Sequence, residues 1–198
     1  MSLRIRPYTP PMPLQQAACE RRVYRLATLL TGDLDAATGI MEAVLRAQPD
    51  LRAVESARLD RLTVLRCREV SSRPLLTEDL PGEAARAIAS LGAQPHEVWL
   101  LVRAYGLPLR EAARAMDCSV TATTRHLQRA DETMAGALGG GVGGSIEALR
   151  AYSKSVQVPA SYLAGQQRRR RHRRVLTMVL LLLLALVLLA IADLLSPG

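Results

Sequence analysis

The C-terminal end of the chain holds a long uncharged segment that limits what the rest of the molecule can be. Residues Val175 to Ala192 are eighteen consecutive residues without a charged side chain. A helix rises about 1.5 Å per residue, so this segment would be roughly 27 Å long, close to the thickness of a bilayer hydrocarbon core. Buried helices of globular proteins seldom contain more than about 14 apolar residues in a row. We therefore predict a transmembrane helix over residues 175–195.

A run of arginines comes directly before this segment, and six residues, 193–198, follow it. Positive charge stays on the cytoplasmic side of a membrane, so the sequence predicts a single-pass protein with its N-terminal domains in the cytoplasm. Arginines next to a membrane span also attract anionic lipid headgroups. A nucleic-acid patch is the less favoured alternative, because the run adjoins the predicted span. The predicted membrane-surface residues are Arg168, Arg169, Arg170, Arg171, Arg173 and Arg174.

The charge of the chain is unevenly distributed. The whole chain has a formal net charge of +8, of which residues 168–198 carry +5 and residues 1–167 carry +3. The high isoelectric point therefore belongs mainly to the predicted anchor, and it does not by itself indicate a nucleic-acid-binding domain.

The residue types that most enzymes need are sparse. The three cysteines, Cys19, Cys67 and Cys118, are far apart and form no Cys/His cluster, so neither a disulfide framework nor a zinc site is predicted. The three histidines are also scattered, and no glycine-rich phosphate loop is present. We predict that the chain is not an enzyme and needs no cofactor or metal.

The chain before the anchor follows a helical pattern. Apolar residues recur at spacings of three and four, and no segment alternates with a period of two, which predicts an all-α fold without strands. Gly32 and Asp33 are predicted to end one helix and to cap the next. The expected order is a disordered lead-in (1–13), a helical domain (14–73), a linker (74–82), a second helical domain (83–138), and a glycine-rich hinge with a basic tether (139–174).

The second domain has the spacing of a helix-turn-helix. A short helix over 109–116 precedes the turn 117–119, and Ser119 is predicted to cap a longer helix that ends near Gly136. Arginine and glutamine can read guanine and adenine edges, and threonine can touch phosphate or a thymine methyl group. An αα-hairpin with a solvated polar face remains the alternative. The predicted DNA-binding residues are Thr121, Thr124, Arg125, Gln128 and Arg129.

The residues of both domains resemble a known family. Residues 95–119, continuing to Arg125-His126-Leu127-Gln128-Arg129-Ala130, look like region 4 of the extracytoplasmic-function sigma factors of RNA polymerase. Leu29-Leu30-Thr31-Gly32-Asp33, followed by Asp35-Ala36 and Glu42-Ala43-Val44-Leu45-Arg46, resembles region 2 of the same family. The resemblance covers about residues 14–138, with the two regions in the family's order.

This resemblance implies a transcription regulator at the bacterial inner membrane. Region 4 would bind promoter DNA, and region 2 would bind the RNA polymerase core through a surface that includes Asp35, Glu42 and Arg46. An anti-sigma factor, or a protease that cuts near the glycine-rich segment, would be further partners.

The sequence also departs from the family pattern. Ala37-Thr38-Gly39-Ile40-Met41 stands where the family has Glu-Asp-Leu-Val-Gln, and the chain contains no phenylalanine. Residues 80–138 hold equal numbers of arginines and carboxylates, so this region is formally neutral. The alternative is a sigma-like protein-interaction module at the membrane that does not bind DNA.

Overall fold

The computed structural model describes residues 12–48, 54–70, 80–160, 162–163 and 177–178. Helices and turns account for these residues and no strand occurs among them, which confirms the all-α prediction. No helix in the described ranges is long and apolar enough to cross a membrane. The predicted anchor lies outside the described residues except for Thr177 and Met178, as do the arginine run and most of the lead-in.

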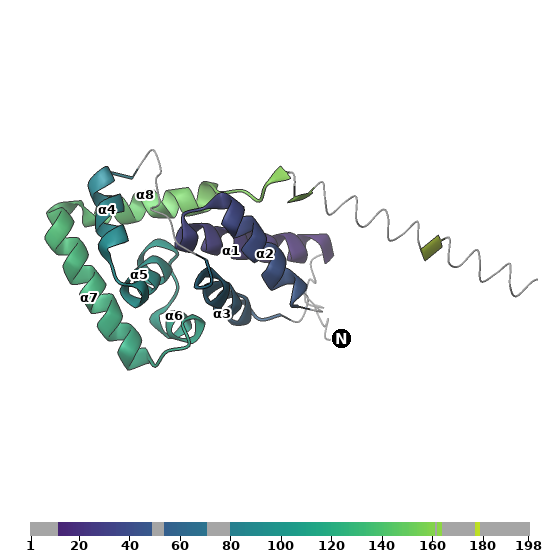
Figure 1. Ribbon diagram of the computed structural model, residues 1–198, viewed down its shortest axis with the longest axis horizontal. Coiled ribbons are helices and arrows are strands. Elements are labelled where there is room, and N and C mark those ends of the chain that lie inside the picture. The colour runs from purple at the N-terminus through teal and green to yellow at the C-terminus, as the bar shows by residue number, and fades with distance from the viewer. Residues whose placement is uncertain (1–11, 49–53, 71–79, 161, 164–176, 179–198) are drawn as a thin grey trace, which may run out of the picture. The chain divides into compact units, whose positions relative to one another are not determined.

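The chain divides into two units, Met1–Val158 and Pro159–Gly198. The first unit contains both of the helical domains predicted from the sequence, and all the elements described below belong to it (Figure 1).

Three helices form the N-terminal bundle of this unit: α1 (Met12–Thr31), α2 (Leu34–Arg46) and α3 (Ser56–Cys67). Helix α1 packs against both α2 and α3 (Figure 1). Its buried stripe recurs at helical spacing, which is the pattern of an amphipathic helix facing a core. This core contains Val23, Tyr24, Leu26, Ala27 and Leu30 of α1, Ala37, Ile40, Met41 and Val44 of α2, and Leu59 and Val64 of α3.

The C-terminal bundle consists of α4 (Gly82–Ser90), α5 (Ala93–Trp99), the π-helical turn η1 (Leu100–Ala104), α6 (Leu109–Ala115) and α7 (Val120–Leu138). Trp99 is fully buried in its core. Helix α7 packs against α4, α5 and α6. Small alanine side chains line the facing sides of α4 and α6, which lets these short helices approach their neighbours closely.

The predicted helix boundary at Gly32 and Asp33 is confirmed. Gly32 adopts a φ of 66°, a left-handed conformation that a residue with a side chain adopts only at a cost. The Asp33 carboxylate accepts hydrogen bonds from the backbone N–H groups of Asp35 and Ala36. This N-cap satisfies two of the donors that the start of α2 leaves free.

The glycine-rich segment 139–144, predicted to be a flexible hinge, is helical instead. Gly139–Gly141 forms a 3-10 turn (η2), and α8 begins at Val142 and continues to Ser155. Helix α8 packs against α1, η1 and α7, and Leu149 is fully buried. Glycine disfavours a helix by about 1 kcal/mol per residue, but the buried face of α8 stabilises the helix through tertiary packing that single-sequence propensity does not include.

Candidate nucleic-acid interface

Helices α6 and α7 have the lengths and the connection of a helix-turn-helix. Helix α6 contains seven residues and ends at Ala115, and α7 contains nineteen residues and begins at Val120. The Ser119 hydroxyl accepts a hydrogen bond from the Ala122 backbone N–H at 3.1 Å, which confirms Ser119 as the N-cap of α7. A cap at this position fixes where the longer helix begins relative to the shorter one.

The turn between the two helices is a Schellman motif. The Cys118 N–H donates to the Ala113 carbonyl at 3.0 Å, and the Asp117 N–H donates to the Arg114 carbonyl at 3.3 Å. Asp117 has a φ of 59°, the left-handed conformation that this motif requires. Aspartate tolerates this conformation better than most residues with a side chain. The turn between α6 and α7 is therefore held by backbone geometry.

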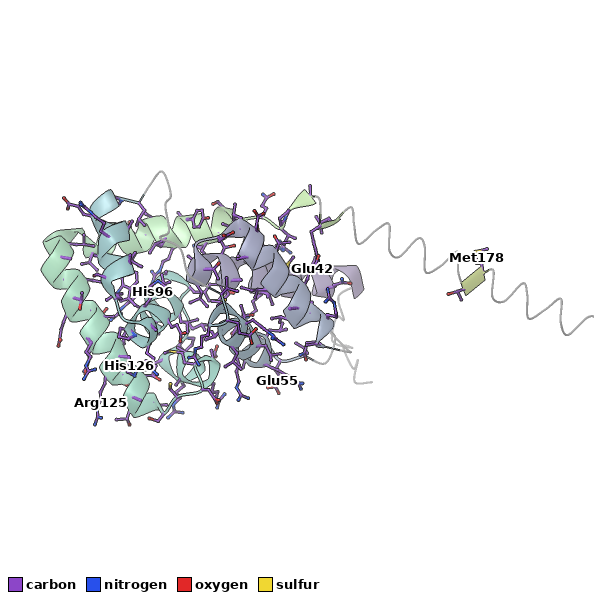
Figure 2. The ribbon with its side chains drawn as sticks, viewed as in Figure 1. Glu42, Glu55, His96, Arg125, His126 and Met178 are labelled. Atoms are coloured by element: carbon purple, nitrogen blue, oxygen red, sulfur yellow. The ribbon has the colours of Figure 1, made fainter. Side chains whose placement is uncertain are left out.

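The first half of α7 presents most of the predicted DNA-binding residues to solvent. Thr121, Arg125, Gln128 and Arg129 are exposed, and Arg125 is labelled on α7 in Figure 2. Thr124 is half-buried, and its hydroxyl donates to the Val120 carbonyl at 2.8 Å. The opposite side of the helix contributes Thr123, Ala130 and Met134 to the core. The five predicted residues therefore belong to the side of α7 that faces away from its bundle.

The charges farther along α7 weaken this surface as a phosphate-binding face. Asp131 forms an ion pair with Arg103 through two contacts, one of them 3.1 Å long between Nε and Oδ1. Glu132 is exposed one residue later. Arg125 and Arg129 have no ion-pair partner among the residues that the structure describes. The basic character of α7 is therefore confined to its first three turns.

Helix α3 of the N-terminal bundle lies beside the turn of the helix-turn-helix. A groove between α3 and α6 is lined by Arg58 and Arg61 from α3 and by Arg114 and Asp117 from α6 and its turn. Arg61 pairs with Asp117 at 3.1 Å, and both side chains are largely exposed. Arg114 was not among the predicted site residues. No sequence signal distinguishes it, because its neighbours on α3 are more than fifty residues away in the chain.

Most of the arginines of α3 and its C-cap are engaged with carboxylates. Arg66 pairs with Glu69 at 2.9 Å, and Arg68 pairs with Glu97 of α5 at 2.7 Å. Arg61 and Arg68 both bind acidic groups of the C-terminal bundle.

The residues predicted to bind the polymerase share one face of α2. Asp35, Glu42 and Arg46 are spaced seven and four residues apart, so they point in nearly the same direction from the helix axis. Asp35 and Arg46 are exposed, and Glu42 forms a 3.4 Å ion pair with Arg46. The buried residues Ala37, Ile40 and Val44 occupy the opposite face. No described element of the first unit covers this polar face of α2.

The described residues offer no group of three or more His, Cys, Asp or Glu side chains placed to hold a metal ion. The three cysteines are free thiols. Burial raises the pKa of the Cys67 thiol to about 12, and this residue lies in the core as an apolar filler.

No protein-family model matches the chain, and no curated protein shows a significant match. Among solved structures, the chain is similar to the co-crystal structure of the sigma factor RpoE in complex with the anti-sigma factor NepR from Bartonella quintana. The identity is 17%, the TM-score is 0.49, and the match covers 63% of this chain and 95% of that chain.

Proposed function

We propose that the chain is a membrane-tethered, sigma-factor-like transcription regulator that binds promoter DNA through α6 and α7. The observation that carries this proposal is the exposed start of α7, where Thr121, Arg125 and Gln128 follow a capped turn and a short preceding helix. A recognition helix places its N-terminal residues against base edges in the major groove. Arg129 on the same helix supplies a charge for a backbone phosphate.

Contact with the RNA polymerase core is assigned to α2. The exposed polar face with Asp35, Glu42 and Arg46 belongs to the segment that resembles region 2. A face that no other described element of the first unit covers is available to a partner protein. The family pattern has carboxylates at positions 37 and 38, and Ala37 is buried in this chain. The change at Thr38 alone therefore lowers the negative charge of this surface, which predicts weaker association than in typical family members.

The membrane tether is assigned to residues 168–195 on sequence grounds. The six arginines and the following uncharged segment support one span with the helical unit on the cytoplasmic side. A tether of this kind raises the local concentration of the regulator near membrane partners.

A second function, a protein-interaction module that does not bind DNA, is favoured by one specific observation. Arg61 and Arg68, whose guanidinium groups could otherwise bind phosphates, pair with Asp117 and Glu97. A surface that neutralises its own arginines releases few counterions when it meets DNA. Such a module would bind an anti-sigma factor or another partner at the membrane.

Capture of core RNA polymerase by the full chain, held in a neutral-lipid nanodisc, separates the two functions. The proposal predicts that wild-type protein retains polymerase, and that charge reversal at Asp35 and Glu42 abolishes retention. Reversal at Glu83, an exposed carboxylate of α4, is the matched control and should leave retention unchanged. Failure of wild-type protein to retain polymerase, with an intact helical signal, would leave the interaction module as the better account.

A further inference from the structure

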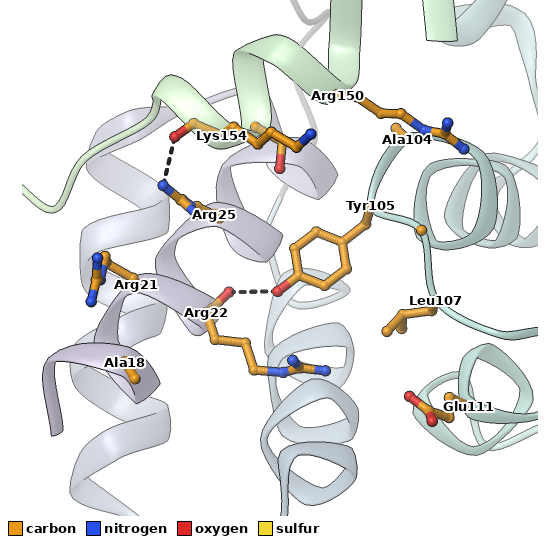
Figure 3. Close-up of a pocket in the computed structure, with 12 residues that line it drawn as sticks. Ala18, Arg21, Arg22, Arg25, Ala104, Tyr105, Leu107, Glu111, Arg150 and Lys154 are labelled. Atoms are coloured by element: carbon orange, nitrogen blue, oxygen red, sulfur yellow. Dashed lines mark hydrogen bonds between the residues drawn. The ribbon is translucent and has the colours of Figure 1, made fainter. Parts of the chain in front are cut away.

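A basic pocket lies in the first unit, away from the exposed face of α7. It has a volume of about 730 Å³, within the range of small-molecule sites. Its lining comes from three segments of the chain: α1, the stretch from η1 to α6, and α8 (Figure 3). The charged residues of the lining are Arg21, Arg22, Arg25, Glu111, Arg150 and Lys154.

Two of these arginines are held in place by backbone carbonyls, which carry no formal charge. Arg25 donates from Nε to the Val156 carbonyl at 3.2 Å and from Nη2 to the Lys154 carbonyl at 2.5 Å (Figure 3). Arg150 donates from Nε to the Arg103 carbonyl at 2.8 Å. A guanidinium has five N–H donors, so both side chains keep donors for a ligand after these bonds are made. Among the described residues, no carboxylate pairs with either of these two charges.

Arg22 is different, because a buried carboxylate already neutralises it. Its guanidinium binds both oxygens of Asp60, at 2.8 and 2.7 Å. Its role in the pocket is structural: it lies 5.9 Å from the centre of the Tyr105 ring, and its carbonyl accepts the Tyr105 hydroxyl at 3.4 Å. Burial raises the pKa of Tyr105 to about 12, so the phenol adds no negative charge at neutral pH.

The net charge of the other residues that line the pocket is strongly positive. Arg25, Arg150 and Lys154 have no carboxylate partner among the described residues, and Glu111 is the single carboxylate of the lining. The region around Tyr105 is also shaped by the π-helical turn η1, where the Tyr105 N–H bonds to the Leu100 carbonyl. Such turns are rare and occur often at functional sites.

We propose that this pocket is a binding site for a small anion that carries more than one phosphate group. Phosphate oxygens match the forked donors of arginine, and a compact lysine charge binds the same group as a point charge. A ligand with a single carboxylate group would leave most of the positive charge of the pocket unbalanced. Two or more phosphates can reach α1 and α8 at the same time.

Binding at this position would stabilise the fold of the first unit. The ligand would connect α8 to α1 and to the η1–α6 segment, which are distant in sequence, and a ligand that binds the folded state alone raises the unfolding temperature. Two sources supply this chemistry: a soluble polyphosphate compound, and the headgroup of a phosphorylated lipid. The lipid source is included because Lys154 lies only fourteen residues before the arginine run that is predicted to contact the membrane surface.

Thermal unfolding of the full chain in neutral-lipid nanodiscs tests the proposal. Inorganic tripolyphosphate represents the soluble source, and nanodiscs that contain a bisphosphorylated inositol lipid represent the lipid source. Either ligand is expected to raise the midpoint of unfolding of the helical unit. A rise with tripolyphosphate alone assigns a soluble ligand, and a rise with the lipid alone assigns a headgroup. Orthophosphate at equal concentration should give a smaller rise.

Three variants show whether the rise comes from this pocket and not from the arginine run. Lys154→Gln should weaken binding about tenfold, the value of one charge-assisted hydrogen bond. Glu111→Gln removes the opposing charge and should tighten binding, a gain that misfolding cannot mimic. Arg86→Gln, on the exposed side of α4 outside the lining, should leave binding unchanged. The proposal is overturned if no ligand raises the midpoint, or if the three variants respond alike.

Discussion

Arg68 at the end of α3 and Glu97 of α5 form a two-point ion pair that joins the N-terminal and C-terminal bundles. Arg68 donates from Nε and Nη2 to the two carboxylate oxygens of Glu97, at 2.8 and 2.7 Å, and also from Nη2 to the Met116 carbonyl at 3.0 Å. The Glu97 side chain is 13% exposed, so solvent screens this pair less than an ordinary surface pair. The hydrogen bond to Glu97 is also the main reason that the pKa of Arg68 is raised.

We therefore expect Glu97→Gln to lower the free energy of unfolding by about 1 kcal/mol, because a neutral amide cannot replace a two-point charged contact. Urea unfolding followed by the fluorescence of Trp99, the single tryptophan, measures this change. Glu69→Gln breaks a solvent-exposed pair with Arg66 and serves as the control, with an expected change below about 0.5 kcal/mol. Equal effects of the two substitutions would show that the Arg68–Glu97 contact does not stabilise the packing of the bundles.

The Arg22–Asp60 pair joins α1 to α3 and is more deeply buried. Asp60 is 1% exposed, and its carboxylate has both oxygens bonded to Arg22. Removing one partner of a buried pair leaves the other charge unsolvated, so Arg22→Met is expected to cost about 3 kcal/mol. The double variant Arg22→Met with Asp60→Leu should lose less unfolding free energy than the two single variants lose in total. A double-mutant cycle by urea unfolding measures this coupling, and strictly additive effects would contradict it. The exposed pair Glu42–Arg46 should show little coupling.

Replacing Gly39, in the middle of α2, is expected to stabilise the fold. Gly39 lies on the exposed face, and a Cβ placed there meets no heavy atom within 4 Å. Gly39→Ala should raise the free energy of unfolding by about 1 kcal/mol, the difference in helix propensity. Gly106→Ala is the contrasting control, since Gly106 has a φ of 86° and a side chain there should cost about 1 kcal/mol. Thermal unfolding by circular dichroism distinguishes the two, and a stabilising effect of Gly106→Ala would be inconsistent with this backbone.

Histidine 96 should make stability depend on pH in the weakly acidic range. It lies beside Cys67, Arg68 and Glu97, and burial lowers its pKa below the ordinary value of 6.5. The unfolded state then binds a proton more readily than the folded state between the lowered pKa and 6.5. Stability is therefore fully present above about pH 6.5 and falls as the pH drops below it. His96→Gln should flatten the profile of unfolding free energy below about pH 6.5. An unchanged slope in this variant would assign the dependence to another group.

Local signals in the sequence predicted the elements well where backbone chemistry decides them. The left-handed Gly32, the Asp33 cap and the Ser119 cap each depend on one residue and its immediate neighbours. The face of α2 that carries Asp35, Glu42 and Arg46 follows from helical periodicity alone. These features need no knowledge of distant contacts.

The contacts between distant segments could not be predicted in the same way. Arg25 binds carbonyls at Lys154 and Val156, about 130 residues farther along the chain. Nothing in either segment marks the other as its partner. The helical state of residues 142–144 likewise depends on the packing of α8 against α1 and η1, which overrides the low helix propensity of glycine. The basic pocket is a product of these same long-range contacts.

A salt series on the full chain in neutral-lipid nanodiscs measures DNA binding by α7. Fluorescence anisotropy of duplex promoter fragments gives the dissociation constant at each salt concentration. We expect Arg129→Gln to make the slope of log K against log salt shallower by about one unit, and Arg125→Gln to weaken binding by tenfold or more, about 1–3 kcal/mol. Arg86→Gln should match wild type. Binding that is equal in all four proteins, or absent in wild type at low salt, would contradict the account.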